Sequence, residues 1–234
     1  MSEPKVFTAS PEAKATARKF RTYAIIGWAV AMLAQVLCIM KLISDETLIG
    51  LIASIVVILA ITFFSGRFWK KSNKLDPTSE KNALRFFLQN QLGAIMGVLC
   101  FLPMVISIFT SNNISGKTKA IAGTAASAAM TAAGISGAEF DSASIEKYTK
   151  EIKEQNKDAE SVGINSNLVY WSKAGNKYHA YTDCQYIKGK SQNSGSIKKS
   201  WEEKGISELC KVCKKRSIKA SASKVKEKVL EEVN

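Results

Sequence analysis

The sequence predicts a mainly α-helical protein, in which a helical transmembrane bundle is followed by a small α+β C-terminal domain. Three long stretches, residues 22–40, 47–66 and 86–116, contain no charged residue. The chain nevertheless combines a net charge of +13 with 46% hydrophobic residues. The charged and the apolar residues therefore occupy different regions, which a single soluble core explains poorly. Uncharged apolar stretches of about 20 residues are long enough to cross a bilayer as helices.

The N-terminal segment, residues 1–22, is interpreted as a basic helix that precedes the membrane. It is polar and basic, so it is not expected to act as a signal peptide. Ser10 offers a capping hydroxyl, and Pro11 follows at the first helical position. This order is typical of a helix start.

The first three spans follow from the apolar stretches. We expect them over residues 23–42, 48–64 and 91–110. The link between the first two is very short, which predicts a helical hairpin. Pro103 lies inside the third span and is expected to kink it, because proline lacks the amide hydrogen that a continuous helix needs.

Residues 120–138 leave the number of spans at four or three. Nine of these nineteen residues are alanine, and none is charged. Such a segment is either a fourth span that packs through small residues or an alanine-rich surface helix. We favour the span, with Gly123, Ser127 and Thr131 on its packing face because they recur at every fourth position.

The basic flanks predict how a multi-pass protein of the cell (cytoplasmic) membrane is oriented. The N-terminal segment carries five Lys/Arg and residues 67–85 carry six, whereas the turn at 44–47 carries none. The positive-inside rule then places the N-terminus and residues 67–85 in the cytoplasm. With four spans the C-terminal domain is also cytoplasmic, and with three it faces outward.

The rest of the chain is divided by composition. Residues 139–166 are expected to form a helical stalk and a linker, and residues 167–216 a compact module. Residues 217–234 are expected to form an amphipathic helix, because apolar residues recur there at helical spacing. These apolar residues are Ile218, Ala222, Val225, Val229 and Val233.

The module contains the only histidine of the chain and three of its five cysteines, which are His179, Cys184, Cys210 and Cys213. Their spacing is His-x4-Cys-x25-Cys-x2-Cys. Cys210 and Cys213 alone would also suit a redox pair, but that reading leaves the other two residues unexplained. Four nitrogen and sulfur ligands in two close pairs indicate a tetrahedral zinc site. Since four protein ligands leave no position for water, we expect a closed, structural Zn²⁺ site.

The secondary structure of the module is predicted from its turn residues. Residues 168–172 and 177–181 should form a hairpin, followed by a polar loop over 188–195. A short helix should then run from the Ser196 cap to Gly205. The aromatic residues are expected to form a small core around the metal; they are Trp171, Tyr178, Tyr186 and Trp201.

Residues 169–179 together with 184–189 resemble a small bacterial zinc module that is appended to various membrane proteins and secreted nucleases. Its ligand layout is similar to that of the metal-binding domain of the Ada DNA-repair protein. The resemblance covers residues 167–216 and implies a module rather than an activity. Ada-type domains hold the metal with four cysteines, one of which accepts a methyl group. Here His179 stands at the first ligand position, which argues against alkyl transfer.

No Walker loop, dinucleotide-binding glycine pattern, nucleophile elbow or HExxH motif is present. We therefore expect no enzyme, no catalytic residues and no cofactor other than zinc. The favoured function is a membrane-anchored interaction or scaffold protein whose module docks a protein partner or mediates self-association. The alternative is a membrane-tethered nucleic-acid-binding protein, because residues 167–219 are rich in lysine. A small transporter is disfavoured by the absence of charges within the spans.

Overall fold

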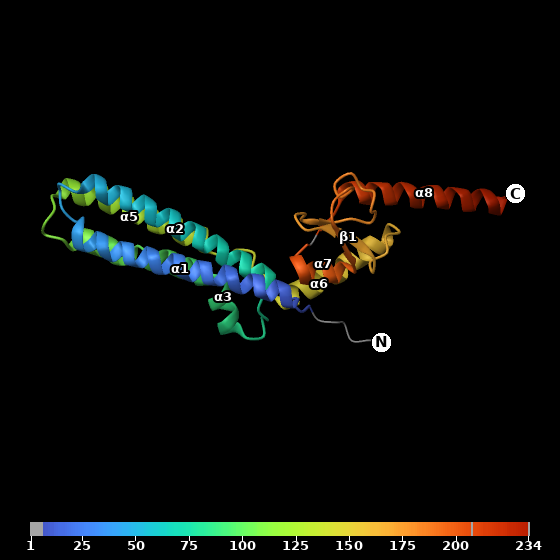
Figure 1. Cartoon of the computed structure of the whole chain (residues 1–234), viewed down its shortest axis with the longest axis horizontal. Coiled ribbons are helices and arrows are strands. Elements are labelled where there is room, and N and C mark those ends of the chain that lie inside the picture. Colours follow the sequence, from blue (N-terminus) through green and yellow to red (C-terminus); the bar gives the residue numbers. More distant parts are fainter. Residues whose placement is uncertain (1–6, 207, 234) are drawn as a thin grey trace. The chain divides into compact units, whose positions relative to one another are not determined.

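The computed structural model describes residues 7–206 and 208–233, and the side chains of these residues up to 223 (Figure 1). The chain forms two compact units. We call Ala15–Ala143 the helical unit. We call the second, which combines the residues up to Lys14 with those from Ser144 onward, the terminal unit.

The helical unit is built from α-helices joined by short links. They are α1 (Pro11–Lys41, which starts in the terminal unit), α2 (Leu48–Leu75), α3 (Ala83–Leu99), α4 (Leu102–Thr110) and α5 (Gly116–Gly137). Three segments are long and apolar enough to cross a membrane: α1, α2, and α3 together with α4. These correspond to the first three predicted spans. Helix α5 lies outside this set, because alanine, glycine, serine and threonine give it a low hydropathy.

Two local predictions about these helices are confirmed, and one boundary differs. Helix α1 begins at Pro11, and the Ser10 hydroxyl accepts a hydrogen bond from the Ala13 amide at 3.1 Å. The apolar segment 83–110 breaks at Cys100 and Phe101, and Pro103 lies in the first turn of α4. The boundary expected between residues 22 and 23 is absent, because α1 continues through it without interruption.

Helix α5 packs against α2, α3 and α4. Its buried residues are Thr118, Ala122, Gly123, Ala126, Ala129, Ala133 and Gly137. The face predicted from Gly123, Ser127 and Thr131 is therefore wrong for the last two, since Thr131 is exposed and Ser127 only half-buried. The Thr131 hydroxyl needs no partner on another helix, because it donates to the Ser127 carbonyl within α5.

Helices α3 and α5 cross with their backbones in close approach. A Cβ atom added to Gly93 would lie 2.6 Å from the carbonyl oxygen of Gly137, and one added to Gly97 would lie 2.7 Å from that of Ala133. Small residues at i and i+4 on both helices thus allow the two backbones to touch. This is the packing mode that membrane helices favour.

Substitution of Gly93 by alanine is expected to lower the stability of the helical unit by about 1–3 kcal/mol, because the new methyl group meets backbone rather than a movable side chain. Thermal unfolding of the full chain in mild detergent measures this loss. The matched control is Gly134→Ala on α5, where the nearest atom, Val98 Cγ2, lies at an ordinary 3.5 Å. Equal melting temperatures for the two variants would contradict the close crossing.

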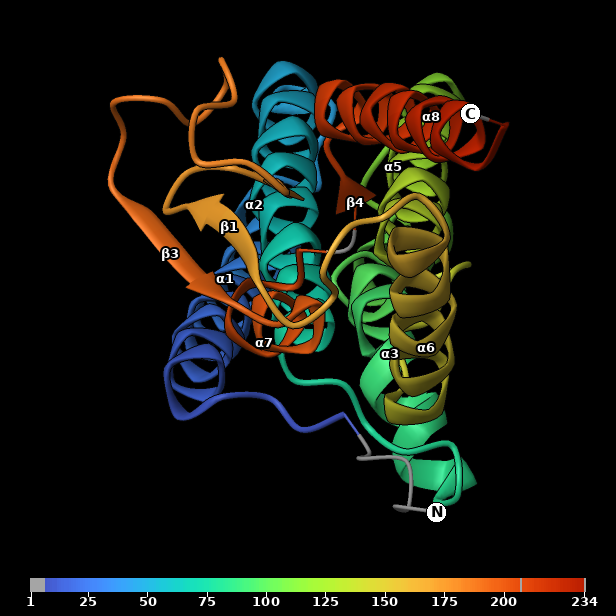
Figure 2. The same ribbon diagram turned by 90° about the vertical axis from the view of Figure 1, so that its right-hand side faces the viewer.

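The terminal unit combines helices with short strands. In chain order its elements are α6 (Ile145–Ser161), β1 (Val169–Ser172), β2 (Lys177–Tyr178), β3 (Gln192–Gly195), α7 (Ile197–Lys204), β4 (Glu208–Leu209) and α8 (Lys211–Val233). Strand β1 pairs with β3 in antiparallel orientation, with Val169 opposite Gly195 (Figure 2). Strand β2 pairs with β4 in parallel orientation, with Lys177 opposite Glu208.

Two predictions for this unit are corrected. The hairpin expected between 168–172 and 177–181 is reduced to one bridge, between Tyr170 and His179. The segment 188–195, expected as a loop, supplies strand β3 at its end. The chain turns away after His179 to deliver Cys184, so β1 takes its strand partner from residues 192–195 instead. The Ser196 cap and the left-handed Gly205 at the end of α7 are confirmed.

The helix expected as a stalk packs its apolar face within the terminal unit. Tyr148 and Ile152 of α6 are buried, and the Tyr148 ring lies 4.8 Å from that of Trp201 on α7. The N-terminal segment completes this cluster: the Phe7 ring lies 5.1 Å from Tyr148, and the Phe7 amide donates to Thr149 Oγ1 at 3.0 Å. Residues near both ends of the sequence thus share one core.

Helix α8 begins at Lys211, six residues before the predicted C-terminal helix. Its first turn therefore carries Cys213, which was expected in a separate ligand turn. The predicted apolar face continues through Val225, Val229 and Val233, whose side chains lie outside the described residues.

Candidate metal centre

The structure brings His179, Cys184, Cys210 and Cys213 together. One ligand atom from each lies within 4.8 Å of the others, and all four side chains are buried. The three sulfur atoms belong to free cysteines. The cluster therefore has the residue types, the count and the spacing of a tetrahedral metal site.

Strand pairing places the two halves of the site beside each other. His179 directly follows β2, and its backbone exchanges two hydrogen bonds with Tyr170, at 2.7 and 2.8 Å. Cys210 directly follows β4, and its amide donates to the Tyr178 carbonyl at 2.9 Å. The parallel β2–β4 register, with Tyr178 opposite Leu209, thus brings the histidine next to the first cysteine of the CxxC pair.

The other two ligands come from a tight turn and a helix start. The Cys184 carbonyl accepts from the amides of Ile187 and Lys188, at 2.9 and 2.8 Å, which fixes the turn that carries its thiol. Cys213 lies in the first turn of α8, which the hydrogen bond from the Lys214 amide to the Cys210 carbonyl closes at 2.9 Å. Both close pairs of the sequence pattern are therefore held by local backbone hydrogen bonds.

The distances within the cluster fit a zinc ion. Zinc–sulfur bonds of about 2.3 Å and zinc–nitrogen bonds of about 2.0–2.1 Å place tetrahedral ligands about 3.5–3.8 Å apart. The Cys184 and Cys210 sulfurs are 4.0 Å apart. His179 Nδ1 lies 3.3 Å from the Cys184 sulfur and 3.7 Å from that of Cys213. A disulfide requires sulfur atoms about 2.05 Å apart, so Cys184 and Cys210 are spaced as metal ligands rather than as a bonded pair.

The electrostatic surroundings of the four ligands indicate what a bound cation would do there. Burial raises the pKa of the Cys213 thiol to about 12, and backbone hydrogen bonds from Ala180 and Tyr181 oppose part of this rise. Burial also lowers the pKa of His179, as does the nearby Lys190, so its imidazole is held in the neutral form that binds metals. A bound dication would stabilise the thiolate that burial alone disfavours.

An ion pair connects α8 to the turn that carries Cys184. Arg216 donates to both carboxylate oxygens of Asp183, at 2.7 and 2.9 Å, and its guanidinium lies 4.3 Å from the centre of the Tyr181 ring. The pair is half-exposed, so it contributes orientation more than stability. It links the elements that supply Cys184 and Cys213.

Three of the four aromatic residues expected around the metal are buried, but the aromatic side chains that pack against the cysteine cluster are Tyr170 and Tyr181. Trp171, Tyr178 and Trp201 are buried, whereas Tyr186 is 55% exposed. The expectation for Tyr186 is therefore wrong. Its ring instead lines a pocket on the surface of the module.

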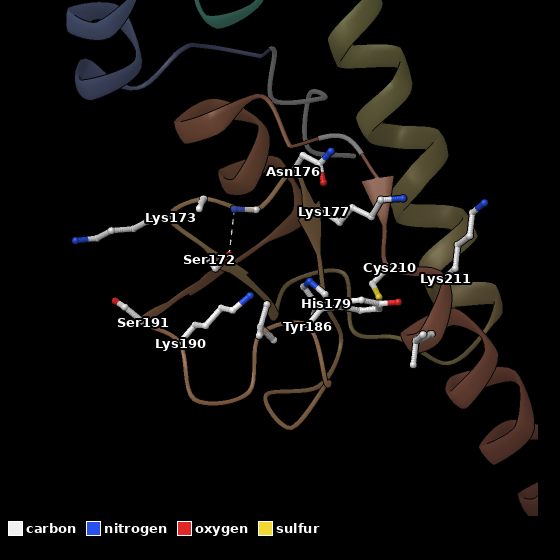
Figure 3. Close-up of a pocket in the computed structure, with 14 residues that line it drawn as sticks. Ser172, Lys173, Asn176, Lys177, His179, Tyr186, Lys190, Ser191, Cys210 and Lys211 are labelled. Carbon is white, nitrogen blue, oxygen red and sulfur yellow. Dashed lines mark hydrogen bonds between the residues drawn. The ribbon is translucent and has the colours of Figure 1, made fainter.

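This pocket, of about 590 Å³, lies directly against the cluster, because His179 and Cys210 form part of its wall (Figure 3). Four lysines also line it: Lys173, Lys177, Lys190 and Lys211. Lys177 is paired with Glu208 at 2.9 Å. Within the described residues the other three form no ion pair, and no acidic residue lines the pocket. The pocket is therefore electropositive.

Sequence reasoning missed this pocket. Lys173 and Lys190 are remote in sequence and line one pocket only because the turn after β1 and the segment before β3 border the same cavity. The general lysine excess of residues 167–219 was the only available signal.

The chain is thus of a class that combines three helices of membrane-spanning length with a buried His-Cys₃ cluster in a small separate unit. No protein-family model, curated protein or solved structure matches it. The resemblance to the Ada-type zinc module therefore rests on the sequence alone.

Proposed function

We propose that this chain is a membrane-anchored interaction protein, in which a structural zinc shapes a docking pocket for an acidic segment of a protein partner. The observation that carries the proposal is the electropositive pocket against the cluster. Binding is favoured over catalysis, because His179 and the three cysteines would complete a tetrahedral zinc shell and leave no position for water.

Zinc would act here through the shape of the pocket. The pocket is bordered by the turn after β1, by the segment before β3 and by the start of α8. His179, Cys184 and Cys210 connect these regions to one centre. A zinc ion bound by them would hold the pocket lysines at fixed separations, which lowers the entropy cost of binding.

The lining favours a protein segment over nucleic acid. Alongside the lysines, Tyr186, Ile187 and Val212 provide apolar surface. A carboxylate side chain next to an apolar one satisfies both parts of this lining. Nucleic acid is recognised instead by an extended basic surface that follows the phosphate backbone, and a bounded pocket does not provide one.

The terminal unit also supports a four-span topology. Residues 7–14 belong to the same compact unit as residues from 144 onward, which favours one side of the bilayer for both segments. Both segments on one side would need an even number of crossings between them, so the three candidate spans would be joined by a fourth. Helix α5 has 22 residues and is about 33 Å long, enough for a hydrocarbon core of about 30 Å. The basic flanks favour the cytoplasm as the shared side.

The docking proposal is tested by peptide binding to the full chain in detergent. The probe is a fluorescent peptide that alternates glutamate with leucine, and its glutamine counterpart is the reference. The double variant Lys173→Glu with Lys190→Glu is expected to weaken binding by about tenfold or more, because attraction becomes repulsion at two points of the wall. High salt should weaken binding as well.

The matched control is Lys188→Glu, an exposed lysine of the same loop that does not line the pocket. It is expected to leave peptide affinity within about twofold of the parent value. Equal losses for the control and the double variant would show diffuse attraction and contradict a defined pocket. Stronger binding of a single-stranded oligonucleotide, sensitive to the same two lysines, would favour the nucleic-acid alternative.

A further inference from the structure

The helical unit carries a second cavity, which is independent of the proposed docking pocket. It has a volume of about 570 Å³ and is lined by residues of α1, α2 and α3 and of the link before α3. The lining residues are Arg21, Trp69, Asn82, Leu84, Arg85, Leu88, Gln89 and Leu92. We propose that this cavity binds one anionic phospholipid, with its phosphate between Arg21 and Arg85 and an acyl chain along α3.

The position of the cavity is that of a membrane–water boundary. Arg21 is the last charged residue before the apolar part of α1, and Arg85 is the last before that of α3. Trp69 lies two residues after Arg67, the first charge that follows the apolar part of α2. Tryptophan is enriched at the level of the lipid headgroups. All three helices therefore place this transition at the same cavity.

The polar end of the cavity is held in place by a hydrogen-bond network. Arg21 donates from Nη1 to Asp76 Oδ2 and from Nη2 to the Asp76 carbonyl, both at 3.0 Å. Gln89 Nε2 donates to the same carbonyl at 3.0 Å, and the Gln89 carbonyl accepts from Trp69 Nε1 at 2.7 Å. Arg21 is thus fixed before any ligand arrives, while about a quarter of its side chain stays exposed.

Arg85 supplies the uncompensated charge. Its side chain is exposed, and no carboxylate pairs with it in the part of the chain that the structure describes. No acidic residue lines the cavity. A guanidinium presents two parallel N–H donors, which matches the oxygen pair of a phosphate. The pair of arginines therefore favours an anionic headgroup over a zwitterionic one.

The apolar end of the cavity matches an acyl chain. Leu84, Leu88 and Leu92 follow one another at i, i+4 and i+8 on α3 and line the same cavity. Leu84 is 70% exposed and Leu88 is 45% exposed, whereas Leu92 packs partly against the helical core, so the stripe is uncovered at its arginine end. A stripe that begins beside the arginines and continues into the apolar part of α3 fits a headgroup with its attached chain. Basic pockets between membrane helices bind anionic lipids in this way.

Native mass spectrometry of the full chain in detergent, with added phosphatidylglycerol or phosphatidylcholine, tests this proposal. We expect one retained phosphatidylglycerol per chain and at least about tenfold less phosphatidylcholine. Arg85→Gln should reduce phosphatidylglycerol retention by about tenfold. Leu88→Asn should reduce it as well, since it places an amide in the path of the acyl chain.

The matched control is Arg67→Gln, because Arg67 is an exposed arginine at the same boundary that does not line the cavity. It should leave retention within about twofold. Equal losses for Arg67→Gln and Arg85→Gln would show general surface attraction and overturn the proposal. Equal retention of phosphatidylcholine would overturn it too. If inorganic phosphate displaces phosphatidylglycerol, and if Leu88→Asn retains this lipid as well as the parent chain does, the cavity is an anion site rather than a lipid site.

Discussion

Replacement of Cys184 by serine is expected to abolish zinc binding and to unfold the part of the terminal unit around the cluster. The four ligands come from three segments, since Cys210 and Cys213 share one, and the strands that join these segments are only two to four residues long. Such strands are too short to hold the fold without the metal. A structural zinc contributes on the order of 10 kcal/mol in small domains, more than any other single interaction here.

The measurement is elemental analysis of the purified full chain together with its thermal unfolding. The parent chain should hold one zinc, and Cys184→Ser should hold none and lose the unfolding transition of the terminal unit. Cys38→Ser and Cys100→Ser are the matched controls, because both cysteines are buried in the helical unit. They should keep the zinc. A metal-free parent chain that retains a cooperative transition for the terminal unit would refute a structural role for zinc.

The same variant tests whether membrane association depends on zinc binding. The helical unit shares no ligand with the cluster, so Cys184→Ser should still fractionate with membranes. It should also lose the acidic peptide, because the segments that border the docking pocket would no longer be held by one centre. If the variant binds the peptide without zinc, the docking pocket does not depend on the metal centre.

Features with a local physical cause were predictable from the sequence. The Ser10–Pro11 helix start, the break before Pro103 and the Ser196 cap each depend on a few adjacent residues. The metal cluster was equally visible, because a lone histidine and a CxxC pair stand out against the composition. Length and hydropathy likewise identified the three segments that can cross a membrane.

Features that depend on pairing between distant segments were not predictable. Strand β3 has the sequence Gln-Asn-Ser-Gly, which carries neither apolar alternation nor β-branched residues. It is a strand because β1 has a free edge beside it. The packing face of α5 was predicted from glycine and hydroxyl residues. Gly123 is buried as predicted, but the crossing with α3 uses Ala133 and Gly137, which lie against the backbone at Gly97 and Gly93.

The surface sites were hidden for a related reason. Arg21 and Arg85 read as ordinary flanking charges, and only the folded helical unit brings them to one cavity with Trp69. Tyr186 read as a core residue, because aromatic content alone does not show which side of a turn faces outward. The charge pattern predicted that basic residues lie at the boundaries, and the tertiary structure shows which of them line the same cavity.

The central claim is that a zinc-stabilised terminal unit is held in the cytoplasm by four spans, of which α5 is the last. The shared core of Phe7, Tyr148 and Trp201 supports this topology, because it favours both ends of the span region on one side. The topology further requires the link between α4 and α5 to face outward. Asn112 in that link and Ala222 on α8 are both exposed, so a cysteine at either position is open to a reagent on its own side.

Labelling of intact cells with a membrane-impermeant maleimide tests this claim most directly. Cys38 and Cys100 are first replaced by alanine, and Asn112→Cys and Ala222→Cys are introduced one at a time. We expect labelling of Asn112→Cys in intact cells, and labelling of Ala222→Cys only after the membrane is permeabilised. Labelling of Ala222→Cys in intact cells would show that α5 does not cross and that the zinc-binding unit faces outward, which would contradict the account.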